Sequence, residues 1–421
     1  MSGPKAASHS RLAGRRAEAE DVAAPDGDVA DGFDAFAEEA PVFGADRRVR
    51  TPVAAVSKGL PKAFVHPDGR RGRGAVTNTS GRYESEARVA IDDGWGGADE
   101  EPAPLRTTVG IDTSRSIITR NQSPDIPFDR SINPYRGCEH GCIYCFARPT
   151  HAYLGLSPGL DFESKLFIKP EAAALLRKEL ARPGYKVDVM AIGTNTDPYQ
   201  PIEREHRIMR QVLEVLMECG HPVAIVTKSN LVLRDLDILA PMAKLGLARV
   251  AVSVTTLDRA LARAMEPRAP TPMRRLEAIA ALAEAGVPTA IMTAPMIPSL
   301  TDHEMEALLA AGARYGATEA SYTVVRLPLE IEGLFVEWLN TNVPDRAKRV
   351  MSLIKSMRKG KAYDSTWGQR TVGTGPLAEL IARRFKLTCA RLGLNRRDWS
   401  FDFSRFRPPI LEKDQRQLRL L

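Results

Sequence analysis

The sequence predicts an α/β fold in which six β-α units form an open, partial barrel. Short apolar runs rich in β-branched residues recur along the 421-residue chain, and turn residues bound each run. Longer stretches in which apolar residues recur at helical spacing lie between these runs. The repeated β-α order predicts a parallel sheet, and six units suit an open barrel better than the closed barrel of eight units.

The expected strands are mostly continuous apolar runs, as in strands that are buried on both faces. They span residues 187–193, 222–228, 248–256, 288–294 and 320–327, with a further strand just before Cys138. The helices between them are expected at residues 170–180, 203–218, 235–245, 272–285 and 302–315. Pro170 and Pro272 suit a first helical turn. Glycines stand where the later helices should end, at Gly220, Gly246, Gly286 and Gly316.

Composition divides the chain into three regions. We expect a disordered, low-complexity extension over residues 1–103, the barrel core over 104–330 and a basic helical region over 331–421. Residues 18–46 hold ten acids and no Lys or Arg, so this stretch has little apolar surface to offset chain entropy. The helices of the last region are expected around residues 332–340, 344–360 and 375–392.

Charge and hydropathy argue against a membrane or secreted protein and favour polyanionic partners. Residues 1–101 carry a net charge of −4 and the rest of the chain +11, which favours polyanionic partners. The best candidate for a membrane span, residues 285–301, is too short and contains three prolines. The basic start is not followed by an apolar run, so it does not predict a signal peptide. We therefore expect a cytoplasmic protein with no membrane partner.

Three cysteines crowd into the segment NPYRGCEHGCIYCFARP, residues 133–149. Cys138, Cys142 and Cys145 have the spacing C-x3-C-x2-C, and Gly137 and Gly141 allow the loop to wind tightly around one centre. Thiolates of this kind select iron–sulfur clusters or zinc. A cluster normally takes four thiolates, and the remaining cysteines, Cys219 and Cys389, are distant in the sequence. Three thiolates on a four-iron cluster would leave one iron open to another ligand.

A structural zinc site is the alternative interpretation of this segment. The three cysteines with His140 or His151 would make a Cys₃His set. Structural zinc motifs, however, usually consist of two separated ligand pairs, so we favour the cluster. We expect Cys219 to cap a helix away from the site and Cys389 to be a small core residue.

The cysteine spacing, with an aromatic Tyr144 before the last cysteine, resembles the signature of the radical S-adenosylmethionine (SAM) superfamily. The segments NPYRGC, GTNTDPYQPIE, VTKS, SVTT and PMIPSLTD resemble the spore-photolyase-like branch of that superfamily, described as DNA-repair-photolyase-like. The resemblance covers about residues 105–421 and implies a radical SAM barrel. It has no counterpart for residues 1–100.

This resemblance implies a [4Fe-4S] cluster and SAM as cofactors, with Cys138, Cys142 and Cys145 as the iron ligands. SAM would chelate the open iron, and an electron from a reductant such as flavodoxin or ferredoxin would cleave it to a 5′-deoxyadenosyl radical. The radical would take a hydrogen atom from a substrate, with a nucleic acid among the candidates. The spore photolyases use a further cysteine as hydrogen donor, and no such residue can be placed here.

The residues at the carboxyl ends of the expected strands are the candidates for the SAM pocket. Where much of the superfamily carries Gly-Gly-Glu, this chain has Thr194, Asn195 and Asp197, which would then bind the SAM amino group. An ordinary β-α turn is the alternative for these three residues. Lys228 could pair with the SAM carboxylate or a substrate phosphate, or be a solvated lysine.

Further candidates follow the next strands. Ser253 and Thr255 share one strand face and suit hydrogen bonds to ribose or carboxylate, although inward-facing filler explains them equally well. Arg268 is a candidate for anion pairing. The resemblance implies that adenine lies against the segment ending at Pro298 and against Tyr144, mostly through its backbone.

The basic region from Arg383 to Leu421 interleaves 11 Lys and Arg with aromatic residues. The aromatic residues are Phe385, Trp399, Phe401, Phe403 and Phe406. They could stack on bases while the arginines pair with phosphates, or they could pack on the barrel while the charges are solvated. Two classes of function remain: a radical SAM enzyme, with a peptide or small molecule as the alternative substrate, and a non-catalytic metal-binding module that contacts nucleic acid.

Overall fold

Six parallel strands form the centre of the computed structural model, and a seventh strand pairs antiparallel at one edge. The structure describes residues 70–84, 104–396 and 399–411, all within one unit of the chain. The strands, in the order in which they pair, are β10 (Glu319–Val324), β9 (Thr289–Met296), β8 (Ala248–Ser253), β7 (Val223–Thr227), β6 (Met190–Ile192), β3 (Arg130–Ile132) and β2 (Ile118–Arg120). Because β10 and β2 do not pair with each other, the barrel is open, as predicted.

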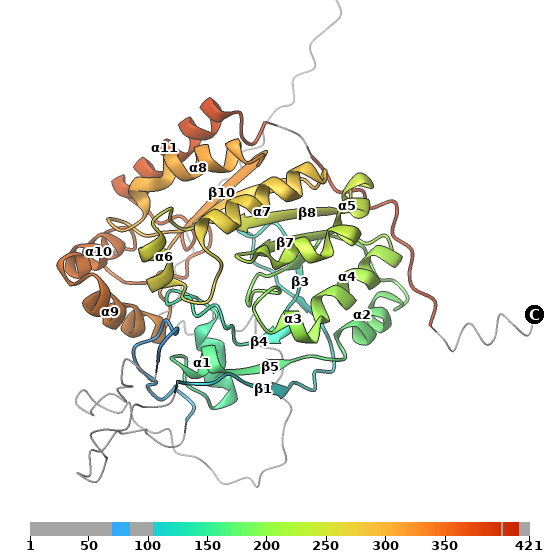
Figure 1. The fold of residues 1–421 in the computed structure, drawn as a ribbon, viewed down its shortest axis with the longest axis horizontal. Helices are drawn as coiled ribbons and strands as arrows, with labels where there is room; N and C mark the ends of the chain where they lie inside the picture. The colour runs from blue at the N-terminus through green and yellow to red at the C-terminus, as the bar shows by residue number, and fades with distance from the viewer. Residues whose placement is uncertain (1–69, 85–103, 397–398, 412–421) are drawn as a thin grey trace, which may run out of the picture. The chain divides into compact units, whose positions relative to one another are not determined.

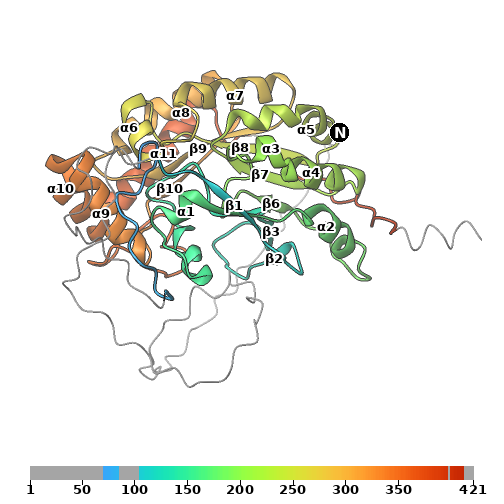
Figure 2. The same cartoon turned by 60° about the horizontal axis from the view of Figure 1, so that its bottom comes forward.

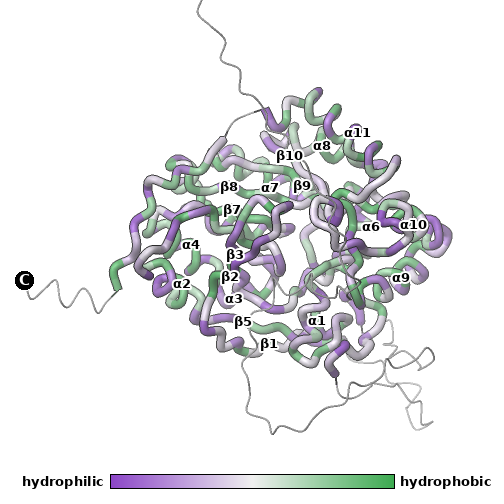
Figure 3. The backbone as a smooth tube through the Cα atoms, turned by 180° about the vertical axis from the view of Figure 1, so that it is seen from behind, coloured by the Kyte–Doolittle hydropathy of each residue, from purple (hydrophilic) through white to green (hydrophobic). Residues whose placement is uncertain are grey.

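Helices follow the parallel strands, as the alternating pattern predicts (Figure 1). They are α2 (Ala172–Leu180), α3 (Glu203–His206), α4 (Ile208–Glu218), α5 (Leu236–Lys244), α6 (Arg259–Met265), α7 (Pro272–Glu284) and α8 (Met305–Arg314). Hydrophobic and hydrophilic segments alternate along such helices (Figure 3). The hydrophobic sides pack on the sheet and form the main core.

Of the two predicted helix-start prolines, Pro170 lies before the N-cap residue Glu171 of α2 and is therefore outside the helix. Pro272 is in the first turn of α7, and the Thr271 side chain caps that helix by accepting from the Arg274 backbone N–H. Gly220 and Gly246, which follow α4 and α5, have φ of 58° and 70°. These left-handed conformations favour glycine and end the helices.

A second, smaller sheet was not predicted. Its strands are β1 (Thr108–Ile111), β5 (Lys165–Ile168) and β4 (Tyr135–Arg136), and β4 ends just before Cys138. The short helix α1 (Asp161–Ser164) and the 3-10 helix η2 (Arg148–Leu154) connect the cysteine segment to β5. This sheet therefore holds both ends of the segment that carries the cysteines.

The region beyond residue 330 is helical, as predicted. It contains α9 (Glu330–Asn342), α10 (Pro344–Ser356) and α11 (Pro376–Leu392). Helices α9 and α10 lie side by side (Figures 1 and 2). They share a hydrophobic core with the cysteine segment, and the Trp338 indole donates to the Ala264 carbonyl at 3.0 Å. This region therefore borders the cysteines directly.

Residues 70–84 differ from the expected disordered extension. Ala75 and Val76 are buried, and the backbone N–H groups of Gly74 and Ala75 donate to the Glu163 carboxylate at 2.8 and 2.9 Å. Composition could not reveal this because the segment is held by backbone and polar side-chain contacts to residues far away in the sequence, such as Arg73 to the Glu163 carbonyl at 2.6 Å, and not by large apolar side chains. The rest of the predicted extension lies outside the described residues.

The segment that follows α11 runs along the amino-terminal ends of the strands. The N–H groups of Asn395, Asp402 and Arg407 donate to the carbonyls that precede β10, β8 and β7, at 3.0, 3.0 and 2.8 Å. A side chain at Gly220 would place its Cβ 2.5 Å from the Arg405 carbonyl oxygen, so this approach requires glycine. Within the part of the chain that the structure describes, no helix has the length and hydropathy needed to cross a membrane.

Candidate iron–sulfur and cofactor site

The cysteine loop lies between β4 and η2 at the carboxyl end of the barrel. Gly137 and Gly141 have φ of 74° and 67°. A Cβ at Gly137 would lie 2.6 Å from Leu166, and one at Gly141 would lie 2.7 Å from Glu163. Both glycines are therefore required for the tight winding that the sequence predicts.

The three thiols are close enough to affect one another. Burial raises the pKa of Cys138, and the nearby Asp197, Cys142 and Cys145 raise it further. Burial also raises the pKa of Cys145, while Arg148, Lys228 and Arg326 oppose this increase. A group of buried thiols surrounded by cations suits a bound metal cluster, which holds its thiolates deprotonated.

The structure places the two histidines of the zinc alternative differently. His140 contacts Asp197 at 3.4 Å. The Nε2 atom of His151 contacts the Lys165 carbonyl at 2.8 Å, whereas its Nδ1 atom is buried without a hydrogen-bond partner among the described residues. Among those residues, no three His, Cys, Asp or Glu side chains gather around a single point, and this holds for the three cysteines as well.

Arg148 and Glu163 hold the cysteine loop from within. The Arg148 guanidinium, fully buried, donates to the carbonyls of Cys142 and Gly141 at 2.9 and 3.1 Å. It pairs with Glu163 at 2.5 Å, and Glu163 in turn accepts from residues 74 and 75. Sequence reasoning missed Glu163, whose partners are up to 89 positions away.

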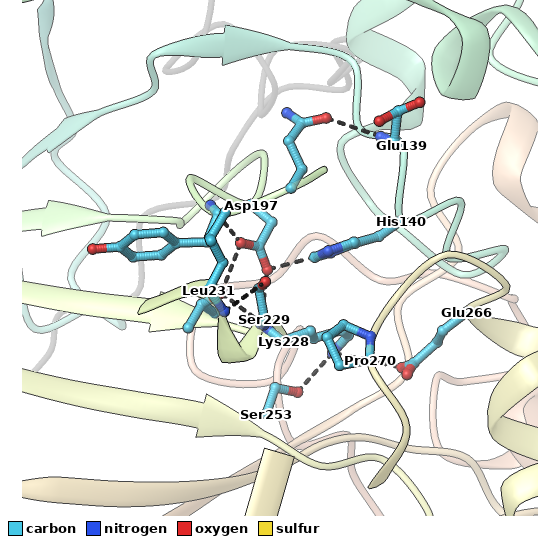
Figure 4. A network of polar contacts seen from close by, with 12 residues as sticks. Glu139, His140, Asp197, Lys228, Ser229, Leu231, Ser253, Glu266 and Pro270 are labelled. Atoms are coloured by element: carbon cyan, nitrogen blue, oxygen red, sulfur yellow. Dashed lines mark hydrogen bonds and ion pairs between the residues drawn. The ribbon is translucent and has the colours of Figure 1, made fainter. Parts of the chain in front are cut away.

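Asp197 organises the loop after β6. Its carboxylate accepts from the Thr227 hydroxyl at 2.7 Å, from the Lys228 N–H at 2.7 Å and from the Tyr199 N–H at 2.9 Å (Figure 4). Burial raises the pKa of Asp197, but His140 and these hydrogen bonds outweigh burial and lower it. These contacts are those of a turn, and they link β6 to β7.

Thr194 and Asn195, in the same loop, are placed differently. The Thr194 hydroxyl is buried and has no hydrogen-bond partner within the described chain. Asn195 is partly exposed. An unsatisfied buried hydroxyl at this edge of the sheet fits a site for a polar ligand group.

Lys228, after β7, extends across the ends of the strands. Its ammonium donates to the Ser253 hydroxyl at 2.6 Å and lies 3.7 Å from the Glu266 carboxylate (Figure 4). It also lies 5.8 Å from the centre of the Tyr144 ring. Lys228 is therefore not a solvated lysine.

Glu266 joins the remaining predicted residues, although sequence reasoning did not select it. Its buried carboxylate accepts from the hydroxyls of Tyr144 and Thr255 and pairs with Arg275. Burial would raise the pKa of Glu266, but Arg275 and Lys228 outweigh burial and lower it to about 2. The Tyr144 hydroxyl thus binds within this network, and the expected contact of its backbone with adenine stays a prediction.

Arg268 and Pro298 stand apart from this network. Arg268 is 39% exposed, pairs with Glu139 at 3.3 Å and lines a cavity of about 280 Å³ together with His140 and Ser229. Pro298 is buried just beyond β9. Cys219 is the C-cap residue of α4, and Cys389 is buried in α11, both as expected.

Residues 132–311 match a family model described as the Radical SAM superfamily. An uncharacterized protein of Mycobacterium tuberculosis is 40% identical over 232 residues, which cover 55% of this chain and 68% of the relative. The chain belongs to the radical SAM superfamily. An uncharacterized protein of Methanocaldococcus jannaschii is 28% identical over 173 residues, covering 41% of this radical SAM chain and 62% of the relative.

Solved structures resemble this radical SAM enzyme more distantly. Spore photoproduct lyase complexed with dinucleoside spore photoproduct is 17% identical, with a TM-score of 0.48, covering 68% of this chain and 80% of the lyase. Streptococcus suis SuiB bound to precursor peptide SuiA is 14% identical, with a TM-score of 0.28, covering 58% of this chain and 46% of SuiB. The radical SAM match itself spans the cysteine loop and β6 to β9.

Proposed function

We propose that Cys138, Cys142 and Cys145 bind a [4Fe-4S] cluster whose open iron takes SAM. The observation that carries this is the set of three mutually interacting thiols on one loop at the carboxyl end of the barrel. When bound, the cluster supplies one electron that splits SAM into methionine and a 5′-deoxyadenosyl radical, which abstracts hydrogen from the substrate.

The chain's own side chains would orient SAM. The unsatisfied Thr194 hydroxyl, with Asn195, offers hydrogen bonds to the amino group of SAM. Lys228 offers a cation to its carboxylate, and Glu266 keeps that ammonium in place from 3.7 Å. Asp197, engaged by four partners, would act by shaping the loop.

Ser253, Thr255 and Tyr144 complete the proposed pocket around Lys228. Their hydroxyls converge on Lys228 and Glu266, which suits polar parts of SAM such as the ribose. Pro298 supplies an apolar surface for adenine, and Arg268 a cation near the cysteine loop. An electron donor such as flavodoxin or ferredoxin would reduce the cluster. The charge of +11 beyond residue 101 favours a nucleic acid as substrate over a peptide or a small molecule.

The test is anaerobic reconstitution of the full chain. We expect brown protein with about four irons per chain and 5′-deoxyadenosine formation when dithionite and SAM are added. Cys138→Ala, Cys142→Ala and Cys145→Ala should each lose the iron and the product. Cys219→Ala and Cys389→Ala are the matched controls and should retain both. Stoichiometric zinc in protein purified without oxygen would contradict the proposal.

A further inference from the structure

Arg326 lies beside the cysteine loop and has no assigned role. It follows β10 at the carboxyl end of the sheet, where Val325 donates its N–H to the Met296 carbonyl at 3.0 Å. Its guanidinium carbon is 4.1 Å from the centre of the Phe146 ring, and Phe146 directly follows Cys145. Arg326, Phe146 and Cys145 are all partly exposed, so a ligand can reach them.

The charge of Arg326 is not neutralised by the protein. Within the part of the chain that the structure describes, its guanidinium forms no ion pair and no hydrogen bond. Burial lowers the pKa of Arg326, and the nearby Arg370 and Arg358 lower it further, while Tyr363 and Asp125 oppose this decrease without reversing it. A partly buried guanidinium without a carboxylate is unfavourable unless an anion joins it.

The neighbouring groups leave an excess of positive charge. Asp125 is bound by both nitrogens of Arg370, at 2.7 and 2.8 Å. Arg358 donates to the carbonyls of Val325 and Arg370 at 2.7 and 3.0 Å and forms no ion pair within the described residues, although the more distant Tyr363 and Asp364 favour its charge. Asp364 itself lies 3.8 Å from Lys359. Arg326 thus has two cations near it, Arg370 and Arg358, and the nearby carboxylate of Asp125 is occupied by Arg370.

We propose that Arg326 binds a phosphate group of the substrate beside the cysteine loop. A guanidinium matches the oxygens of phosphate with two parallel hydrogen bonds, and the excess positive charge favours a doubly charged anion. The Phe146 ring supports one face of the guanidinium and leaves its edge for the ligand. The assignment of this phosphate to the substrate rests on the proposed function. The position beside Cys145 would place the phosphate next to the reacting centre.

The test compares Arg326→Met, which keeps the apolar stem on Phe146, with Arg326→Lys, which keeps a charge. Arg314→Met is the control, because Arg314 is exposed at the end of α8 on the opposite edge. The melting temperature of the full chain is followed against inorganic phosphate and against chloride at equal ionic strength. Phosphate should stabilise the wild type beyond the effect of chloride.

Arg326→Met should weaken the phosphate response about ten- to a hundredfold, and Arg326→Lys should weaken it less. Without phosphate, the melting temperature of Arg326→Met should equal or exceed that of the wild type, because a cation without a partner is removed. Arg314→Met should respond as the wild type does. A lower melting temperature with an unchanged phosphate response would overturn the proposal and make Arg326 a structural support for Phe146.

SAM supplies the other oxyanion at this edge, so its affinity is measured in the same variants. Unchanged SAM affinity in Arg326→Met is expected, and a parallel loss would reassign Arg326 to the SAM carboxylate and overturn the proposal. The phosphate titration needs neither iron nor turnover. Failure of the cluster assignment would appear in iron content and 5′-deoxyadenosine, and failure of the Arg326 site would appear in the phosphate response alone.

Discussion

Glu266 links four side chains that come from three separate parts of the chain. Tyr144 precedes Glu266 by 122 positions, whereas Arg275 follows it by nine. The cysteine spacing could be read directly from the sequence because all three cysteines lie in one loop. The role of Glu266 could not, because it depends on burial and on partners that only the folded barrel brings together.

Glu266→Gln should destabilise the protein. The change removes the carboxylate that neutralises the buried Arg275, and breaking such a pair costs about 3–5 kcal/mol. The free energy of unfolding, measured by denaturant titration, checks this. Glu277→Gln is the control, because Glu277 pairs with Arg274 at 3.0 Å on the exposed surface and should contribute less than about 1 kcal/mol.

The same substitution should alter the acid response. Because the folded protein lowers the pKa of Glu266 from 4.5 to about 2, its ionised form favours folding at pH values above 4.5. This contribution, about 3 kcal/mol, is lost as the pH falls from 4.5 toward 2. The pH dependence of unfolding should therefore be flatter in Glu266→Gln over that window. Equal slopes in the two proteins would contradict this assignment.

At the level of elements, the regular units were predictable and the short ones were not. Strands β7 to β10 and their helices repeat an apolar period over several residues, so the pattern is clear without the structure. A strand just before Cys138 was predicted, but as the first strand of the barrel. Strand β4, at that place, pairs with β5 in the smaller sheet, and β3 is the first parallel strand of the barrel. A partner about 30 positions away leaves no local period in the sequence. Residues 70–84 escaped prediction because their backbone and polar side-chain contacts are with residues far away in the sequence, such as Glu163.

Gly74→Ala tests whether residues 70–84 support the cysteine loop. A Cβ at Gly74 would lie 2.0 Å from the Gly141 carbonyl oxygen, so the segment or the loop must move. We expect a loss of about 1–3 kcal/mol in unfolding free energy and a lower iron content after reconstitution. Gly333→Ala is the control, because open space surrounds Gly333 in α9 and alanine favours a helix by about 0.5–1 kcal/mol. Full iron retention in Gly74→Ala would show that the loop does not need this segment.

On the scale of the whole molecule, the two edges of the sheet differ in role. The cysteines, Lys228 and Arg326 lie at the carboxyl ends of the strands, and residues 395, 396 and 399–407 lie at the amino ends. Two aromatic rings of the basic region pack inward: the ring centre of Phe385 in α11 lies 4.7 Å from that of Tyr322, and that of Phe406 lies 5.5 Å from that of Tyr185, whereas Phe403 is exposed. The geometry therefore favours packing over base stacking for Phe385 and Phe406.

Removing charge from the basic region that begins at Arg383 should lower the stability of the fold and leave nucleic-acid binding unchanged. Arg384 forms an ion pair with Glu306 at 2.6 Å, and Arg405 forms one with Asp402 at 2.9 Å. The double variant Arg384→Gln, Arg405→Gln should therefore have a lower melting temperature. Each phosphate contact contributes about 0.9 to the slope of log affinity against log salt on duplex DNA. That slope, measured by fluorescence anisotropy with a labelled oligonucleotide, should be unchanged. A slope reduced by about two would mean that both arginines contact phosphates.

The position of residues 395, 396 and 399–407 also affects how the nascent chain folds. These residues hydrogen-bond to the starts of β7, β8 and β10, yet the ribosome adds them after every strand of the barrel. The β-α units that are translated first therefore keep the amino ends of their strands uncovered. The segment that covers these ends is translated more than 150 positions later than β7. Contacts of such long range slow folding and leave apolar surface open to association during synthesis. During synthesis the barrel is therefore incomplete until residue 395 has been translated. Folding of the nascent chain should depend more on chaperones when translation pauses between β10 and residue 395.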